Sequence, residues 1–326
     1  MSKAAVMFAR SLTALSLVFL TASCSLIPMP VENDREMLRK ASLSIGEIKA
    51  FVRELGIEPT QALTKTSEQK APTSMLWFWM QRAGTLALSG PIDVRLAIGF
   101  SEIKEKIPLE QVYRVDGYSV YYRQGNEFAD SRSVTTPSFA REAAVRRVTV
   151  VIHEDLHGDG NFDLPWEIEE SLITPLGALA ALEFFKRKAE PGNLQAARAL
   201  LDEERQLSRE LNQLVAAAER SFRDEDIDSA KQKIAAMIPA FPIYERHFQR
   251  QIAGQHPGTV IEAKLSHDLA YYRHYDRIVG LYERNGDLPG LVRDLRRISK
   301  EMLPHEVTAY LVSLEQEKPT VAARWR

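Results

Sequence analysis

Apolar residues recur every three or four positions from Asp34 to Leu55, and Gly56 and Pro59 then interrupt the pattern. This spacing predicts an amphipathic helix that packs one face against a core. The next apolar run, 74–88, has no clear period, so it is compatible with either a strand or a buried helix.

Between Pro91 and Ser133 the pattern becomes typical of strands. Valine, isoleucine and tyrosine are frequent in this interval, and Asp116-Gly117 is a dipeptide favoured in hairpin turns. We therefore predict a small antiparallel sheet in the N-terminal half of the chain.

A helix is also expected from Ser138 to His157, where the apolar positions again keep helical spacing. The β-branched residues at 148–152 lower its helix propensity without changing the period. Glycine, asparagine and proline within 158–165 break the pattern, and a second helix can begin near Pro165.

Nearly all of the sequence after Trp166 has helical spacing, although prolines should bend or split the segment 230–248. A further helix is expected at 266–286. The chain is therefore predicted to be α+β and mostly helical, with a mixed part at 35–150 and a helical part at 151–326. The helix that carries the two histidines would join these parts at the centre.

The first 23 residues have the features of an export signal. Lys3 and Arg10 precede or flank an apolar run that is too short to cross a bilayer as a fixed helix. Small residues lead to Cys24, the only cysteine, in a pattern that resembles a bacterial lipoprotein signal, with Thr21 where leucine is usual. Lipid attachment would account for an unpaired cysteine in an exported protein. An ordinary signal peptide with a spare cysteine is the alternative.

We therefore expect a lipoprotein signal peptide at 1–23, a tether at 24–34 and a folded domain at 35–326. Acyl chains on Cys24 would hold the mature protein to a membrane. Serine rather than aspartate follows this cysteine at position 25. The expected location is therefore the cell envelope, at the periplasmic face of the outer membrane.

Composition argues against one class of partner. Hydrophobic residues make up 45% of the chain and charged residues 26%, as in folded globular proteins. The formal net charge is −2, and the arginines near the C-terminus alternate with acidic and apolar residues. Nucleic acid is therefore not expected as a partner.

Candidate chemistry is concentrated around the two histidines. His153 and His157 are four residues apart, so on a helix both imidazoles project from one face and can bind one Zn²⁺. Glu154 points about a third of a turn away, where it can act as a general base toward water activated by zinc. A catalytic zinc needs a third protein ligand, and spacing alone leaves three candidates: Glu167, Glu169 and Glu170.

Two other interpretations compete with this zinc site. The His-Glu-x-x-His pattern occurs by chance in on the order of one chain in a hundred, so two surface histidines at a helix end would also explain it. Residues 159–170 match an EF-hand-like calcium loop at positions 1, 3, 5 and 12, which are Asp159, Asn161, Asp163 and Glu170. Leu164 stands at position 6, where that loop needs glycine.

The sequence resembles a family of bacterial aminopeptidases that belongs to the zincin superfamily and is gluzincin-like. "VIHEDLH" matches the zinc-binding helix of the family, and "EESLITPLG" matches a later segment through Glu170-Ser171. A fainter likeness extends to "EIKAFVRELGI" and to the C-terminal region that begins "AKLSHDLAYYRHY". The resemblance implies a zincin-like fold, Zn²⁺ as cofactor, Glu170 as third ligand and a peptide as substrate.

The sequence also departs from this family. Asp155 adds a carboxylate to the motif, Glu169 replaces an asparagine, and Pro175 interrupts the second helix. Ile261-Glu262 stands where the family has a paired asparagine. The two histidines and both core glutamates remain, so we expect activity to be retained.

Two further roles are expected of a peptidase of this kind. An aminopeptidase needs a carboxylate for the substrate amine, and Asp155, Glu167 and Glu169 are available. Tyr271, on the helix predicted at 266–286, is a candidate donor to the oxyanion, although packing of its ring into the core is the favoured interpretation. The alternative function is a lipoprotein that binds structural zinc, or calcium, and cleaves nothing.

Overall fold

The computed structural model describes residues 33–68, 74–86, 94–99, 115–126, 133–252 and 255–316. The predicted signal peptide, Cys24 and all but the end of the predicted tether lie outside the described residues. Lipid attachment therefore stays a prediction. From Asp34 onward the described chain forms one compact unit.

The predicted N-terminal helix is confirmed as α1, Asp34–Glu54. Its apolar residues line one face, as their spacing requires, and Ile48 and Val52 are fully buried. Gly56 follows with a φ of 79°, in the left-handed region that glycine adopts at little cost, and the helix ends there.

The predicted sheet is also confirmed. Three antiparallel strands lie in the order β2-β1-β3, with bounds Ser74–Arg82 for β1, Val94–Gly99 for β2 and Tyr118–Asn126 for β3. The apolar run that was compatible with strand or helix is thus the central strand. Asp116-Gly117 forms the turn before β3, where Gly117 has a φ of 80°.

Helices make up most of the remainder, so the fold is mostly helical with a small antiparallel sheet, as predicted. They are α3 (Pro137–Ala140), α4 (Ala144–Gly158), α5 (Trp166–Arg187), α6 (Pro191–Asp224), α7 (Ile227–Met237), α8 (Pro242–Ile252), α9 (Pro257–Tyr272), α10 (Tyr275–Asn285), α11 (Leu288–Leu295) and α12 (Pro304–Gln316). Short 3₁₀ helices follow α4, at Gly160–Phe162, and α7, at Ile238–Ala240. The prolines of 230–248 therefore split that segment, as expected.

The helix predicted from Ser138 to His157 is in fact two helices, α3 and α4. Thr136 caps α3 by accepting a hydrogen bond from the Phe139 backbone N–H at 3.3 Å. At the break, Arg147 donates to the carbonyls of Ala140 and Glu142, both at 2.7 Å. These contacts satisfy backbone groups that a continuous helix would pair within itself, so the interruption is stable.

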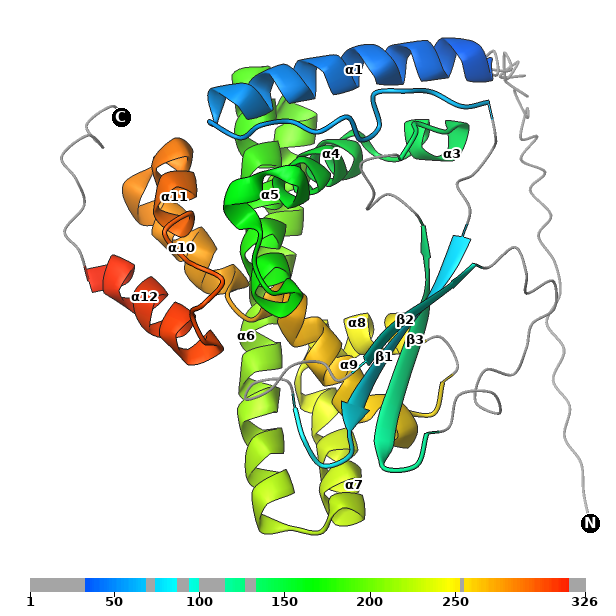
Figure 1. Cartoon of the computed structure of the whole chain (residues 1–326), viewed down its shortest axis with the longest axis vertical. Helices are drawn as coiled ribbons and strands as arrows, with labels where there is room; N and C mark the ends of the chain where they lie inside the picture. Colours follow the sequence, from blue (N-terminus) through cyan, green and yellow to red (C-terminus); the bar gives the residue numbers. More distant parts are fainter. Residues whose placement is uncertain are drawn as a thin grey trace, which may run out of the picture. The chain divides into compact units, whose positions relative to one another are not determined.

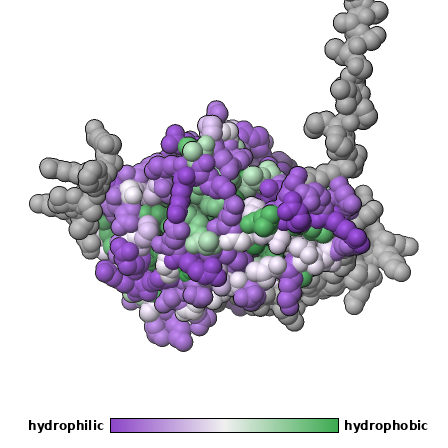
Figure 2. Space-filling view, turned by 90° about the horizontal axis from the view of Figure 1, so that it is seen from above, coloured by the Kyte–Doolittle hydropathy of each residue, from purple (hydrophilic) through white to green (hydrophobic). Residues whose placement is uncertain are grey.

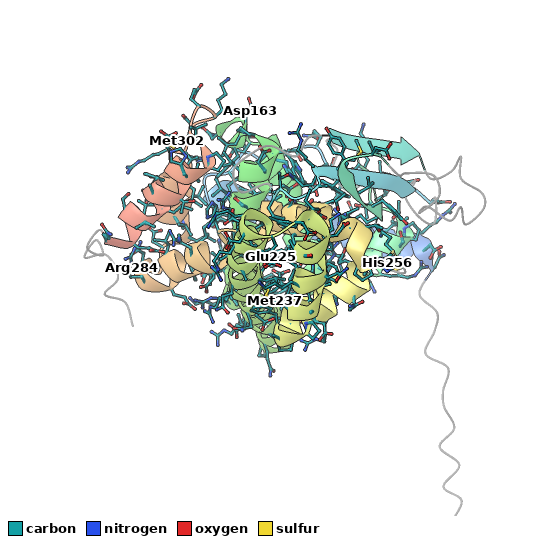
Figure 3. All side chains as sticks on the ribbon, turned by 90° about the horizontal axis from the view of Figure 1, so that it is seen from below. Asp163, Glu225, Met237, His256, Arg284 and Met302 are labelled. Atoms are coloured by element: carbon teal, nitrogen blue, oxygen red, sulfur yellow. The ribbon has the colours of Figure 1, made fainter. Side chains whose placement is uncertain are left out.

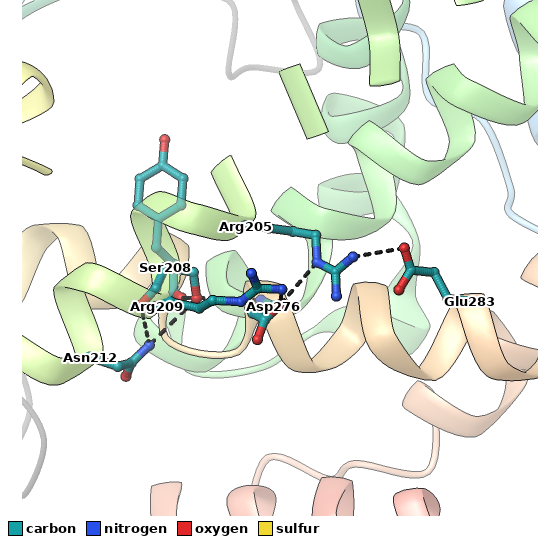
Figure 4. A network of polar contacts seen from close by, with 7 residues as sticks. Arg205, Ser208, Arg209, Asn212, Asp276 and Glu283 are labelled. Atoms are coloured by element: carbon teal, nitrogen blue, oxygen red, sulfur yellow. Dashed lines mark hydrogen bonds and ion pairs between the residues drawn. The ribbon is translucent and has the colours of Figure 1, made fainter. Parts of the chain in front are cut away.

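The helix predicted at 266–286 is also divided, between α9 and α10. Side chains of α6 bind the backbone at this break, as Figure 4 shows. Ser208 Oγ donates to the Tyr272 carbonyl at 2.6 Å, and Asn212 Nδ2 donates to the Arg273 carbonyl at 3.2 Å. Periodicity within 266–286 could not reveal this break, because the residues that stabilise it lie in another helix.

Two apolar clusters form the core, and α6 contributes to both. The first lies among α1, α4, α5 and α10 to α12, and the second lies among the sheet and α6 to α9. Ala197 and Leu201 of α6 belong to the first cluster, whereas Leu211 belongs to the second. Figure 1 shows α6 passing both groups, and Figure 3 labels Glu225 and Met237, which mark the ends of α6 and α7.

The face of the molecule in Figure 2 is mainly hydrophilic, with small apolar areas. Leu43 of α1 is among the large apolar side chains exposed on the described surface. Within the part of the chain that the structure describes, no helix has both the length and the apolar character needed to cross a membrane.

Candidate metal centre

The C-terminal half of α4 positions His153 and His157. Val148, Ile152 and Leu156 are buried on one side of the helix, and this packing outweighs the weak helix propensity of the β-branched residues. The two histidines lie together on the neighbouring side, with ring centroids 4.7 Å apart. Their predicted placement on one helix face is therefore confirmed.

α5 brings Glu170 to these histidines. Pro165 precedes the helix, as predicted, and Glu170 lies at the start of its second turn. Its Oε2 atom is 3.4 Å from His153 Nε2, and its Oε1 atom is 3.4 Å from His157 Nε2. One ligand atom from each of the three residues lies within 4.8 Å of the other two. The structure thus assembles the three residues that were predicted as metal ligands.

Their spacing is compatible with a shared metal ion. Two ligand atoms that are each about 2.0–2.1 Å from a tetrahedral ion lie about 3.3–3.4 Å apart, and each imidazole is 3.4 Å from one of the two Glu170 oxygens. Glu170 Oε2 is also buried without a hydrogen-bond partner, which leaves it available to a cation. Two imidazoles and one carboxylate are a donor set known in catalytic zinc sites. The group can therefore hold a metal ion.

The electrostatics of the group favour positive charge at His157. Burial alone would raise the pKa of Glu170, but hydrogen bonds and charges from His153 and His157 hold it far below its usual range. Burial alone would lower the pKa of His157, but Glu169 and Glu170 raise it to about 10. A bound cation would supply the positive charge that these carboxylates favour.

Glu154 is buried beside this group. Burial raises the pKa of Glu154 to about 7, although the charges of His153 and His157 lower it in part. A carboxyl group that titrates near neutral pH can accept a proton and later return it. Its position on α4 and its pKa both suit the predicted role of general base.

Asp155, by contrast, holds α4 in place and does not belong to the metal group. Its Oδ1 atom accepts from Lys49 Nζ at 2.6 Å, from the Thr60 backbone N–H at 2.9 Å and from Thr60 Oγ1 at 2.8 Å. Gly158 packs against the same threonine so closely that an added Cβ would lie 1.9 Å from Thr60 Cγ2. The end of α4 is therefore fixed to α1 and to the loop that follows α1.

The other acidic candidates have separate positions. Glu169 Oε1 lies 3.2 Å from His157 Nδ1, so it can orient this imidazole from the side opposite to Glu170. Glu167, in the first turn of α5, is half-buried and is not part of the metal group. Asp159, the first residue of the alternative calcium loop, forms an ion pair with Arg296. Because Glu170 faces the histidines, the geometry favours the His–His–Glu group over the loop.

Aromatic residues lie next to the metal group, and one of them was missed from the sequence. Trp166 Nε1 donates to Glu170 Oε1 at 3.0 Å. Its spacing of four residues from Glu170 was the signal that could have identified it. Tyr271, the predicted oxyanion donor, packs edge-on against Trp166 with ring centroids 5.8 Å apart. Trp166 therefore links Tyr271 to the metal group.

A cavity of about 530 Å³ lies elsewhere, among α6, the α9–α10 break and α12. Charged groups at this cavity are paired with one another. Asp276 binds both Arg205 and Arg209, as Figure 4 shows, and Arg277 binds Glu315 at 3.2 Å.

Comparison with known proteins identified no relative: no family model, no curated protein and no solved structure matches the chain. The family resemblance therefore rests on the sequence motifs, and the case for a metal site rests on the geometry.

Proposed function

We propose that this chain is a zincin-like, zinc-dependent peptidase in which His153, His157 and Glu170 hold the metal. The observation that carries this proposal is the assembly of two imidazoles and a buried carboxylate within ligand distance of one another. The group found among the described residues has three ligands. Structural zinc sites usually have four protein ligands, whereas catalytic sites have three and keep one position open.

The residues around the metal group have distinct tasks in the proposed reaction. Zn²⁺, when bound there, would polarise the substrate carbonyl and make a neighbouring water more acidic. Glu154 would accept the proton of the attacking water, as its pKa of about 7 allows, and would deliver it to the nitrogen of the leaving amine. Glu169 would hold the His157 ring through its contact with Nδ1.

Aminopeptidase action is the finer part of this proposal and is supported by the sequence resemblance. Of the three candidate carboxylates for the substrate amine, Asp155 is bound to Lys49 and Glu169 contacts His157. Glu167 therefore remains as the residue that we propose for this task. We further propose that Cys24 carries a lipid anchor and that the domain acts on peptides at the periplasmic face of the outer membrane.

Replacing the proposed proton carrier tests this function. Glu154→Gln keeps the shape of the side chain but cannot accept a proton, so peptide hydrolysis should fall by about 10²- to 10⁴-fold. The zinc content should not change, because Glu154 is outside the ligand group. The measurement is the initial rate of hydrolysis of a set of short peptides, with zinc content determined on the same samples.

Glu47→Gln is the matched control, since Glu47 is exposed on α1, and it should hydrolyse peptides at the parental rate. Equal rates in the parent and in Glu154→Gln would refute the assigned mechanism. A zinc-loaded parent that cleaves no peptide would favour the metal-binding lipoprotein instead.

A further inference from the structure

Arg123, on β3, is a positive charge that has no negative partner among the residues that the structure describes. Its guanidinium carbon lies 5.4 Å from the Trp79 ring centroid and 5.9 Å from that of Tyr271. Its Nη2 atom donates to the Tyr271 hydroxyl at 3.5 Å, a long hydrogen bond. Its Nε atom is buried and has no hydrogen-bond partner. In the described parts of the chain, no ion pair includes Arg123, whereas Arg205, Arg209 and Arg296 are all paired.

The side chain of Arg123 is half-buried, and its buried Nε–H is not satisfied by the described residues. A guanidinium has five N–H donors and remains charged in proteins. Removing it from water without a carboxylate or comparable acceptors is unfavourable, so buried cations are normally paired. The faces of Trp79 and Tyr271 stabilise the charge in part, but they do not accept the free Nε–H.

Aromatic rings connect Arg123 to the proposed metal group. Tyr271 packs against Trp166, which donates to the ligand Glu170. Burial works to lower the pKa of Arg123, whereas nearby groups, Tyr271 first and Glu170 among them, raise it. Tyr271 and Trp166 thus form a continuous chain of contacts between the guanidinium and Glu170.

We propose that Arg123 binds a carboxylate of the peptide substrate, so that the protein prefers peptides with a free carboxylate close to the scissile bond. This inference rests on the proposed peptidase function and defines its substrate class. The planar fork of the guanidinium matches the two oxygens of a carboxylate. Either the C-terminus or an acidic side chain can supply it.

Binding without turnover tests this proposal. The full chain carrying Glu154→Gln and loaded with zinc is titrated with Ala-Ala-Ala, its C-terminal amide and Ala-Ala-Glu-amide by isothermal titration calorimetry. The free acid should bind about tenfold tighter than the amide, or more, because a charge-assisted hydrogen bond is involved. Tight binding of Ala-Ala-Glu-amide would support the same role for Arg123 with a side-chain carboxylate as the source.

When Arg123→Gln is added to the Glu154→Gln chain, its affinity for the free acid should fall to its affinity for the amide. The affinity for the amide should stay unchanged. Arg123→Lys keeps the positive charge but not the planar guanidinium, so it should keep only part of the preference for the acid over the amide. If Arg123→Gln does not fold, Arg123→Lys takes its place as the test. Arg209→Gln, at the distant cavity, is the matched control and should behave like the parent.

Equal affinities of the Glu154→Gln chain for all three peptides, including no binding of any of them, would overturn the proposal. A preference that persists in Arg123→Gln would overturn it as well. The titration needs no cleavage, so a failure of the peptidase proposal would appear separately. In that case the zinc-loaded chain with Glu154 intact would bind the acid but would not hydrolyse it.

Discussion

Glu154, Asp155, Glu169 and Glu170 are similar acids in the sequence, yet each has different surroundings in the structure. Glu170 lies between two imidazoles, Glu169 contacts one of them, and Asp155 accepts from Lys49. Glu154 is buried next to this group, and its pKa rises to about 7 as a result. Residue type alone therefore does not distinguish ligand, proton carrier and structural anchor; burial and partners do.

His274, far from the metal group in sequence, should make the stability of the protein depend on pH. Burial lowers the pKa of His274 to about 3, with Arg273 and Arg277 lowering it further, whereas the unfolded value is about 6.5. Because the folded pKa is depressed, this stabilisation is complete above pH 6.5 and is lost as pH falls toward 3. His274→Gln should therefore reduce the slope of unfolding free energy against pH in this window, by at most about 1.4 kcal/mol per pH unit.

Urea unfolding at several pH values between 7 and 4 measures this slope. His305→Gln, at an exposed histidine of α12, provides the control and should keep the parental slope. If the His274→Gln and parental slopes are equal, the buried imidazole is not the source of the pH dependence.

At the scale of elements, the position of α4 depends on contacts with segments that are distant in sequence. Asp155 is bound to Lys49 of α1 and to Thr60 of the following loop. α4 also packs closely against α5. A Cβ added to Gly177 of α5 would lie 3.5 Å from the His153 Cβ atom of α4, so the two helices that carry the ligands are in close contact. These contacts fix the histidines relative to Glu170.

Asp155→Asn should destabilise the protein strongly, because it leaves the buried Lys49 ammonium without its partner. The expected loss of unfolding free energy is about 3–5 kcal/mol, measured by urea unfolding. Glu36→Gln removes a partner from the exposed Arg39 pair on the same α1 and should have little effect, because solvent screens this pair. Similar losses in the two variants would show that Asp155 is not the anchor of α4.

The elements that local pattern could predict are those whose stability is mainly local. Periodicity predicted α1, and residue type together with a turn signal predicted the sheet. The breaks before α4 and before α10 were not predicted, because Arg147, Ser208 and Asn212 stabilise them through contacts between segments. In the undecided run at 74–88, residues Ser74–Arg82 form a strand through pairing with two other strands, which the sequence of the run does not specify.

The candidate site was predictable to a similar extent. Histidine spacing on one helix was sufficient to predict their shared face. The choice of Glu170 as third ligand came from the resemblance, and its placement between the histidines required the structure. Arg123 lies in a strand before the motif and carries no local signal of a role, so only the tertiary contacts with Trp79 and Tyr271 identify it.

At the scale of the whole molecule, the metal group lies where the two apolar clusters meet. α4 and much of α5 pack in the first cluster, while Trp166 of α5 packs against the second and also binds Glu170. A metal held there would join ligands from two helices and would stabilise the folded state over the unfolded chain. Metal binding is therefore the central claim, on which both the reaction and the substrate preference depend.

Metal content, measured by elemental analysis, tests this claim most directly. The chain from Ser25 onward, which keeps the compact unit that starts at Asp34, is compared with His153→Ala, Glu170→Ala and the control Glu47→Gln, at an exposed residue of α1. The proposed function predicts about one zinc per chain in the parent and in the control, and its loss in both alanine variants. Calcium in place of zinc, or zinc that is retained in both alanine variants, would contradict the proposed centre.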